Sequence, residues 1–393
     1  MTIGVPKEMF PGERRVALVP SIVPSLTKAG FQVVLESGAG DAAGFTDAAY
    51  REKGAQLASR AEVFRTADIL TQVRAAGAAG DAAEADLALL RSNQVVIAMA
   101  EPLGAAQRLR DYADRHVRLF ALELMPRITR AQSMDILSSM ATITGYKAVL
   151  IAADTLPRML PMMITAAGTI KAAKVFVVGA GVAGLQAIAS ARKMGAVVEA
   201  YDVRPAVKEQ VQSLGAKFVE LPLETANTED KGGYAKAQDE SFYQRQREMM
   251  TRVVTASDII ITTAVIPGKK APVLITEAMV KGMAPGSVIV DLAAERGGNC
   301  ELTKPDQAVL AHGVTILGPT NLPSTVPYHA SQMFAKNVVT FLLHLAPTGE
   351  LNIDQSDEIC RDTLVTDGGD IISARIREIL GMTALQTVQA RSF

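Results

Sequence analysis

The segment Lys174-Val-Phe-Val-Val-Gly-Ala-Gly-Val-Ala-Gly-Leu185 decides the fold of this chain. It joins an apolar strand, which ends at Val178, to a helix through three glycines with the spacing G-x-G-x-x-G. In such a turn the first glycine permits a tight bend, the second lets a pyrophosphate approach the backbone, and the third lets helix and strand pack closely. The helix N-terminus then presents free N–H groups to an anion. The segment predicts a dinucleotide site formed by Gly179, Gly181, Val182, Ala183 and Gly184. The alternative is a glycine-rich turn without a ligand.

An acidic residue follows the next expected strand at Asp202, 18 positions after Gly184 (202 − 184). A carboxylate at this place accepts hydrogen bonds from ribose hydroxyls and repels a 2′-phosphate, so it favours NAD(H) over NADP(H). Val203 and Arg204 lie beside it and belong to the predicted site. Arg204 argues in the opposite direction, because an arginine here can accommodate the extra phosphate.

Strand patterns alternate with helical patterns along both halves of the chain, which predicts parallel sheets with helices on both faces. At 393 residues the chain is also longer than one hydrophobic core usually supports. We expect an α/β fold of two Rossmann-like, doubly wound parallel-sheet domains, separated by a cleft and linked by long helices at 133–151 and 328–345. Residues 1–135 with 330–393 would form the first domain, and 136–329 the NAD(H)-binding domain. The expected strands are 3–6, 32–35, 69–73, 95–98, 119–122, 174–178, 197–201, 217–220, 258–262, 287–291 and 314–317.

Composition excludes several classes of function. A net charge of −1 provides no basic surface for nucleic acid. The two cysteines, Cys300 and Cys360, fit a reducing compartment, and neither has the spacing of a metal ligand, so no metal site is expected. The apolar stretch 172–191 contains the three glycines and is interpreted as strand, turn and buried helix. We therefore expect a cytoplasmic protein without direct membrane insertion.

A second polar cluster contains Arg127, Gln132, Asp135 and Ser138. Positions 132, 135 and 138 are three apart, so they would share one face of a helix. A guanidinium, an amide, a carboxylate and a hydroxyl suit a nicotinamide carboxamide and its ribose. The alternative is a solvated helix start capped by Thr129 or Ser133.

Two further segments look like surface loops. Residues 224–248 are rich in charge, contain Gly232-Gly233-Tyr234, and are too long for an ordinary connection. Tyr234 could close over a ligand there, with the glycines as a hinge; a plain surface loop is the alternative. Residues 75–85, rich in Ala and Gly, are expected to form a surface loop that runs into a helix.

The four histidines do not stand in an arrangement that marks a proton acceptor; they are His116, His312, His329 and His344. Oxidation of an alcohol or an amine requires removal of a proton along with the hydride. Hydride transfer from one nicotinamide to another requires no such base.

The sequence resembles the NAD(H)-binding component of proton-translocating nicotinamide nucleotide transhydrogenase. The resemblance covers the whole chain in order and spacing, and the Arg127 cluster and the Gly-Gly-Tyr loop are its most specific features. The matching segments are Ile3–Glu8, Arg14–Leu18, Arg127–Ser139, Ala166–Gly184, Tyr201–Ala206, Gly232–Lys236, Thr262–Gly268, Asp291–Gly298 and Gly318–Ser331.

The resemblance implies roles for these residues. Arg127, Gln132, Asp135, Ser138 and Tyr234 would be the catalytic set, with the first three holding the nicotinamide and its ribose. Val182 to Gly184 would meet the pyrophosphate and Asp202 to Arg204 the adenosine ribose. The remaining cofactor contacts would be Ile128, Thr129, Ser133, Met134, Gly233, Gln246 and Val265.

The resemblance also implies a homodimer that binds NAD(H) and passes hydride to NADP(H) held on a partner subunit. Proton movement would belong to membrane-spanning subunits that this chain lacks. The chain would then lie peripherally on the cytoplasmic face of the inner membrane, attached through those partners.

Two other functions remain as alternatives. An alanine-dehydrogenase-like amino-acid oxidoreductase shares the fold and the opening motif, but its catalytic histidine is missing from residues 95–102. Its substrate-binding lysine corresponds here to Arg74 and its later aspartate to Glu295, while Arg15 is retained. The third possibility is an NAD-binding redox sensor without catalysis, which the Arg127 cluster disfavours.

Overall fold

The computed structural model describes residues 1–220 and 240–383, which form two compact units. Unit 1 comprises Met1–Met140 with Pro323–Phe393, and unit 2 comprises Ala141–Leu322. The chain therefore passes from unit 1 to unit 2 after residue 140 and returns after residue 322, whereas the sequence suggested 135 and 329.

Unit 1 is built on an eight-stranded sheet of order β17-β16-β6-β5-β4-β1-β2-β3. The six strands from β6 to β3 are parallel, and their order, with the switch between β1 and β4, is that of a doubly wound nucleotide-binding sheet. The C-terminal strands β16 and β17 extend it in antiparallel fashion. The bounds are β1 Thr2–Val5, β2 Gln32–Glu36, β3 Gln56–Ala58, β4 Ile69–Arg74, β5 Val95–Met99, β6 Arg118–Ala121, β16 Leu364–Asp367 and β17 Asp370–Ile371.

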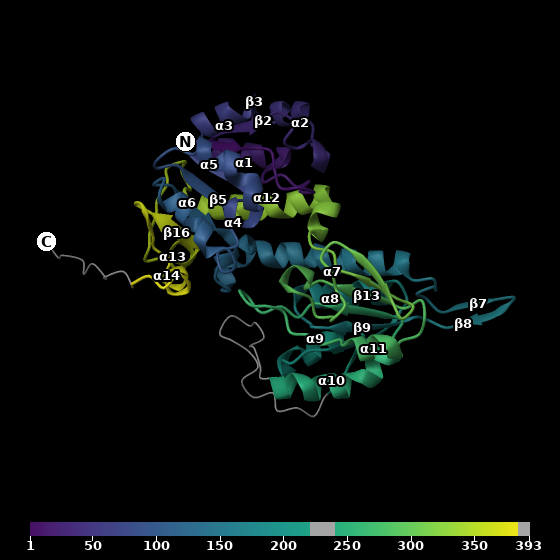
Figure 1. Cartoon of the computed structure of the whole chain (residues 1–393). Helices are drawn as coiled ribbons and strands as arrows, with labels where there is room; N and C mark the ends of the chain where they lie inside the picture. The colour runs from purple at the N-terminus through teal and green to yellow at the C-terminus, as the bar shows by residue number, and fades with distance from the viewer. Residues whose placement is uncertain (221–239, 384–393) are drawn as a thin grey trace. The chain divides into compact units, whose positions relative to one another are not determined.

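Helix α12 (Pro327–Leu345) brings the chain back into unit 1 (Figure 1). Phe334, Val338 and Phe341 are fully buried, and the ring of Phe341 meets Phe120 of β6 edge to face at 5.5 Å. The C-terminal segment thus packs on the first domain, as expected. The other helices of unit 1 are α1 Val23–Lys28, α2 Asp47–Glu52, α3 Arg60–Thr66, α4 Ala76–Ala79, α5 Glu84–Leu89, α6 Arg110–Ala113, α13 Glu358–Thr363 and α14 Ala374–Ile379.

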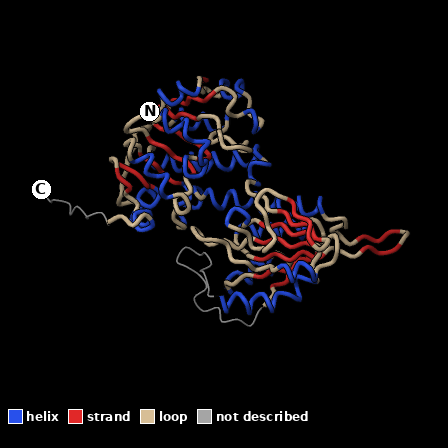
Figure 2. The backbone as a smooth tube through the Cα atoms, in the orientation of Figure 1, coloured by secondary structure: helices blue, strands red, loops and turns tan. Residues whose placement is uncertain are grey.

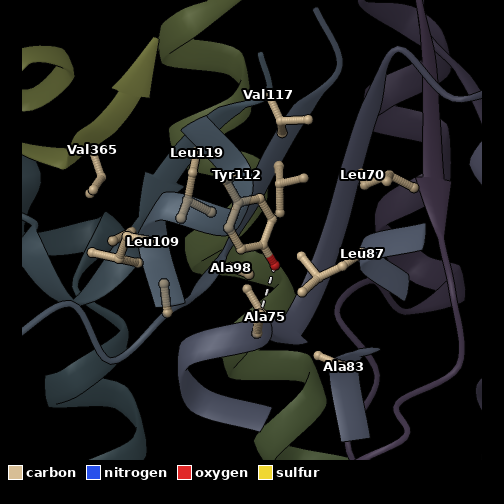
Figure 3. Packing of buried hydrophobic residues seen from close by; sticks show 14 of the residues in the cluster. Leu70, Ala75, Ala83, Leu87, Ala98, Leu109, Tyr112, Val117, Leu119 and Val365 are labelled. Atoms are coloured by element: carbon tan, nitrogen blue, oxygen red, sulfur yellow. Dashed lines mark hydrogen bonds between the residues drawn. The ribbon is translucent and has the colours of Figure 1, made fainter. Parts of the chain in front are cut away.

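The Ala- and Gly-rich residues 75–85 are not a surface loop, so that prediction is wrong. They form α4, the 3-10 helix η3 (Gly80–Ala83) and the start of α5, and Ala75, Ala76 and Ala83 are buried in the core (Figure 3). The N–H of Ala76 donates to the hydroxyl of Tyr112 at 2.9 Å. Alanine and glycine occur here because the helix lies against the sheet: a Cβ on Gly77 would lie 1.8 Å from the carbonyl oxygen of Ala100.

Unit 2 contains a seven-stranded sheet of order β11-β10-β9-β12-β13-β15-β14, again with the doubly wound order over its six parallel strands. All six expected strands are present, and the edge strand β14, which is antiparallel to β15, was not expected. The bounds are β9 Lys174–Val178, β10 Val197–Tyr201, β11 Lys217–Phe218, β12 Ile259–Thr262, β13 Val288–Asp291, β14 Ala308–Ala311 and β15 Val314–Leu317. The helices are α8 Val182–Lys193, α9 Lys208–Ser213, α10 Glu240–Thr255 and α11 Glu277–Gly282.

Unit 2 also carries a β-hairpin that the sequence did not suggest. Strands β7 (Met163–Thr165) and β8 (Gly168–Ile170) pair only with each other and project from the body of the unit (Figures 1 and 2). Every residue in both strands is exposed, including Ile164 at 79%. The hairpin therefore presents apolar side chains away from the core of its own unit.

Helix α7 (Ile136–Thr155) runs through the point where the chain leaves unit 1. Ala148, Val149 and Ala152 lie in one core cluster with Val175 and Val177 of β9. In the described portion of the chain, α7 alone has the length and apolar composition to cross a membrane, a test that core helices also pass.

Candidate functional site

The glycine-rich turn between β9 and α8 can be formed only by glycine at two positions. Gly179 has φ +100°, and a Cβ there would lie 2.4 Å from Oγ1 of Thr263. That hydroxyl donates to the carbonyl oxygen of Gly179 at 3.0 Å. A Cβ on Gly184 would lie 1.8 Å from the same carbonyl oxygen. These two glycines bring strand and helix together, as the sequence suggested.

The third glycine, Gly181, leaves space and not a contact. Its φ is −73°, and a Cβ there would have Nη2 of Arg204, at 3.9 Å, as its nearest neighbour. It is the N-cap of α8 and supplies no side-chain cap to the N–H groups of the first turn. A twelve-residue helix with an open, uncapped N-terminus fits a pyrophosphate, because its N–H groups and dipole both favour an anion.

Asp202 and Arg204 form a buried ion pair beside this turn. Oδ1 of Asp202 accepts from the backbone N and the Nε of Arg204 at 2.8 and 2.9 Å. Its Oδ2 accepts from Nη2 of Arg204 at 2.8 Å and from the N–H of Ala180 at 2.7 Å. The two side chains are only 5% and 13% exposed.

This ion pair corrects the argument from sequence, which treated Asp202 as an unpaired carboxylate. Four donors occupy the roughly four acceptor positions that a carboxylate offers. The guanidinium also neutralises the charge that would repel a 2′-phosphate. The preference for NAD(H) therefore depends on both residues of the pair.

The Arg127 cluster does not lie on one helix, so the predicted common face of residues 132, 135 and 138 is wrong. Gln132 belongs to the 3-10 helix η6 (Thr129–Met134), Asp135 is extended with φ −75° and ψ 95°, and Ser138 lies in α7. The backbone breaks at Asp135 because its carboxylate caps α7. Oδ1 accepts from the N–H of Ser138 at 3.0 Å and Oδ2 from its Oγ at 2.6 Å. Neither Thr129 nor Ser133 is the cap that the alternative assumed.

The cluster is nevertheless accessible over much of its length. Arg127, Thr129, Gln132 and Ser133 are exposed, while Ile128, Asp135 and Ser138 are partly buried. Met134, which was expected to contact the cofactor, is buried in unit 1 and anchors η6 together with Ala131. The polar atoms best placed for a ligand are therefore those of Arg127, Gln132 and the capped Asp135.

The other predicted site residues differ in position. Gly232, Gly233 and Tyr234 lie outside the described residues. Gln246 is buried on α10, where its side chain borders the hydroxyl of Tyr201. Val265 is half-exposed on the loop that follows β12.

Two residues that shape this region were missed from the sequence. Asn299 accepts from the N–H of Ala264 at 3.0 Å and donates to the carbonyls of Ala264 and Pro272, both at 2.9 Å, so it holds the loop that carries Val265. Thr263 bonds the glycine turn, as described above. The available signal was position: polar residues at the carboxyl ends of parallel strands lie at the edge where nucleotides bind.

Arg15 and Arg74, which bear on the amino-acid dehydrogenase alternative, both bind Glu13. Arg15 meets the Glu13 carboxylate through Nε and Nη2, each at 2.7 Å, and Nε of Arg74 meets it at 3.0 Å. The side chains of Arg15 and Glu13 are 2% and 0% exposed. Burial raises the pKa of Glu13, but the hydrogen bond and charge of Arg15 and the charge of Arg74 lower it further, to about 2. Arg15 therefore has a structural partner inside the protein.

No group of three or more His, Cys, Asp or Glu side chains within residues 1–220 and 240–383 is arranged to hold a metal ion.

Comparison with known proteins gives consistent results over both units. Residues 4–144 match the N-terminal domain of the alanine dehydrogenase/PNT family and residues 148–374 match its C-terminal domain. The chain is 47% identical over 376 residues to an NAD(P) transhydrogenase alpha subunit of Rhodospirillum rubrum, covering 95% of this chain and 98% of that protein. The alanine dehydrogenase of Mycobacterium tuberculosis is 28% identical, with 97% of each chain covered.

A solved transhydrogenase structure from Sinorhizobium meliloti superposes with a TM-score of 0.83 at 43% identity, covering 95% of this chain and all of that one. An L-alanine dehydrogenase structure superposes almost as well, with a TM-score of 0.81, but at 24% identity. The shared fold thus extends to both enzymes, while the sequence is much nearer to the transhydrogenases.

Proposed function

Since the chain belongs to the alanine dehydrogenase/PNT family, we propose that it is the NAD(H)-binding alpha subunit of a proton-translocating NAD(P) transhydrogenase. The observation that carries this choice is the identity of 41–47% with transhydrogenase alpha subunits over almost the whole chain, against 28% with alanine dehydrogenase. The chemistry of the chain agrees with it. Residues 95–102 contain no histidine, and Arg15 is bound by Glu13 within the protein.

In this proposal the glycine turn and the N-terminus of α8 bind the pyrophosphate, and Asp202, Val203 and Arg204 bind the adenosine ribose. The open space at Gly181 and the uncapped helix support the first role. The buried ion pair supports the second if Arg204 yields acceptor positions of Asp202 to the ribose hydroxyls. The residues of this half of the site are Gly179, Gly181, Val182, Ala183, Gly184, Asp202, Val203, Arg204 and Val265.

Arg127, Gln132 and Asp135 bind the nicotinamide and its ribose in this proposal, and Ser138 contributes through Asp135. Bound NADH supplies the hydride from C4 of its dihydronicotinamide to NADP⁺ held on a partner subunit. The task of this chain is then to hold the ring in place and to exclude water, because no proton has to be removed. Tyr234 and Gly233 complete the site from a segment outside the described residues.

The proposed assembly is a homodimer that joins an NADP-binding component and membrane-spanning subunits at the cytoplasmic face of the inner membrane. The hairpin β7–β8 supports a protein contact, since its exposed Met163, Ile164 and Ile170 gain by burial against another surface. The NADP(H) site belongs to the partner in this arrangement.

A turnover assay tests the function. The purified chain is mixed with NADH and an NADP analogue, with and without an NADP-binding partner, and a parallel sample contains NAD and L-alanine. Hydride transfer that requires the partner supports the proposal. Reduction of NAD by alanine without a partner would instead identify an amino-acid dehydrogenase.

A further inference from the structure

The 3-10 helix η6 cannot determine its own conformation. It has six residues, its ends have no side-chain caps, and isolated helices of this length do not persist in water. Only Ala131 and Met134 are buried, while Gln132 and Ser133 face solvent. Contacts from elsewhere in unit 1 must therefore hold Gln132 in place.

One such contact comes from Asn337 on α12. Its Nδ2 donates to the carbonyl oxygen of Ser133 at 2.8 Å, and its side chain is only 6% exposed. Phe334, Val338 and Phe341 fix α12 in the core on both sides of Asn337. The bond thus links the peptide next to Gln132 to one of the most firmly packed helices of the unit.

The same amide carries a cost. Oδ1 of Asn337 is buried and has no hydrogen-bond partner among the described residues. A buried polar atom without a partner is destabilising, and an apolar side chain of the same size would avoid the cost. Stability alone therefore does not explain an asparagine here, whereas the bond to Ser133 does.

A second attachment holds the same segment at Arg130. Its guanidinium pairs with Asp357, the N-cap of α13, and lies 3.4 Å from Glu358. Oδ2 of Asp357 also meets Nε2 of His344, near the end of α12, at 2.6 Å. Partial burial raises the pKa of Asp357, but the hydrogen bonds with His344 and Arg130 lower it to about 2. Both attachments come from the C-terminal portion of unit 1.

We propose that Asn337 is a positioning residue: it holds η6 so that Gln132 can meet the nicotinamide, with the Arg130–Asp357 pair as a weaker second attachment. This inference rests on the proposed role of the Arg127 cluster in nicotinamide binding. Asn337 itself touches no ligand. Its effect is on the discrimination between nucleotides that carry a nicotinamide and those that do not.

The test compares the affinities for NADH and for ADP-ribose, which lacks the nicotinamide, by titration calorimetry on the full chain. Asn337→Leu removes both the donor and the unpaired oxygen with little change in volume. We expect the melting temperature to stay the same or rise, the affinity for ADP-ribose to stay the same, and the preference for NADH to fall about three- to tenfold, the effect of one net hydrogen bond. Gln132→Ala provides the reference loss of preference.

Ser331→Ala is the matched control, because Ser331 is a buried polar residue of the same helix that bonds the N–H of Val16 at 3.0 Å and not η6. It should leave the preference for NADH unchanged. Arg130→Ala, at an exposed position that tolerates substitution, should reduce the preference in the same direction and by less.

Three results contradict the inference and can be told apart. If Asn337→Leu keeps the wild-type preference while Gln132→Ala loses it, the nicotinamide role stands and Asn337 is not a positioning residue. If Asn337→Leu weakens NADH and ADP-ribose equally or lowers the melting temperature, the residue is structural only. If the wild-type chain binds NADH no more tightly than ADP-ribose, the proposed role of the whole cluster fails, and this inference fails with it.

Discussion

The carboxylate of Asp135 holds Ser138 by both its backbone N–H, at 3.0 Å, and its hydroxyl, at 2.6 Å. One residue therefore ends η6, begins α7 and lies within the proposed nicotinamide site. Its two roles, as helix cap and as ligand, can be separated because asparagine caps helices about as well as aspartate does.

Asp135→Ala should lower the free energy of unfolding by about 1 kcal/mol through loss of the cap, whereas Asp135→Asn should change it little. If the charge also orients the nicotinamide ribose, both variants should slow hydride transfer more than they weaken NADH binding. Urea unfolding and single-turnover transfer to the partner measure the two effects. Equal losses of rate and affinity in Asp135→Asn would count against a role for the charge.

Gly181 and Gly184 should respond differently to alanine. Gly181→Ala has room for its Cβ and a compatible φ, so the protein should keep its stability, but the methyl group enters the space proposed for the pyrophosphate and should weaken NADH binding at least tenfold. Gly184→Ala forces a Cβ to 1.8 Å from a carbonyl oxygen and should also lower the melting temperature. Thermal unfolding with NADH titration distinguishes them. Unchanged NADH affinity in Gly181→Ala would exclude the turn as the pyrophosphate site.

The Asp202–Arg204 pair predicts opposite changes in nucleotide preference. Arg204→Ala removes the neutralising guanidinium and leaves the Asp202 carboxylate to repel a 2′-phosphate, so the ratio of NADH to NADPH affinity should rise. Asp202→Ala leaves a cation beside the turn, so NADH binding should weaken and the ratio should fall. Dissociation constants for both nucleotides test this. A ratio that is the same in both variants would remove the pair from the ribose site.

The buried carboxylate of Glu13 should make the protein sensitive to acid. Its pKa falls from 4.5 to about 2 on folding, so its stabilising effect is complete above pH 4.5 and is lost as the pH falls towards 2. A shift of that size corresponds to on the order of 3 kcal/mol. Glu13→Gln should destabilise the chain by roughly 3 to 5 kcal/mol at pH 7, because it leaves buried arginines without a counter-charge.

The difference between wild type and Glu13→Gln should shrink between pH 5 and pH 3. Urea unfolding at several pH values measures this, and Glu62→Gln, at an exposed ion pair with Arg65, is the control. A difference that does not change with pH would mean that Glu13 keeps an ordinary pKa in the folded protein.

Local patterns were sufficient to predict most of the fold. The six expected strands of unit 2 are present because a continuous apolar run between glycines has few alternatives as a buried parallel strand. The roles of Gly179 and Gly184 in the turn also followed from sequence, since a tight bend and a close helix contact exclude any Cβ. Residues 75–85 were misjudged, because alanine and glycine occur both in loops and where a helix packs tightly on a sheet.

The sequence by itself therefore determined the doubly wound topology, the position of the dinucleotide turn and the identity of the polar cluster. Only the tertiary structure decided how those polar groups are used: Asp135 as a cap that divides the cluster, Asp202 bound on both oxygens, and Ser133 held by Asn337 from 204 residues further along the chain. The physical reason is range. Backbone periodicity depends on neighbours within a few residues, whereas the partner of a carboxylate or an amide is any group that folding brings within about 3 Å of it.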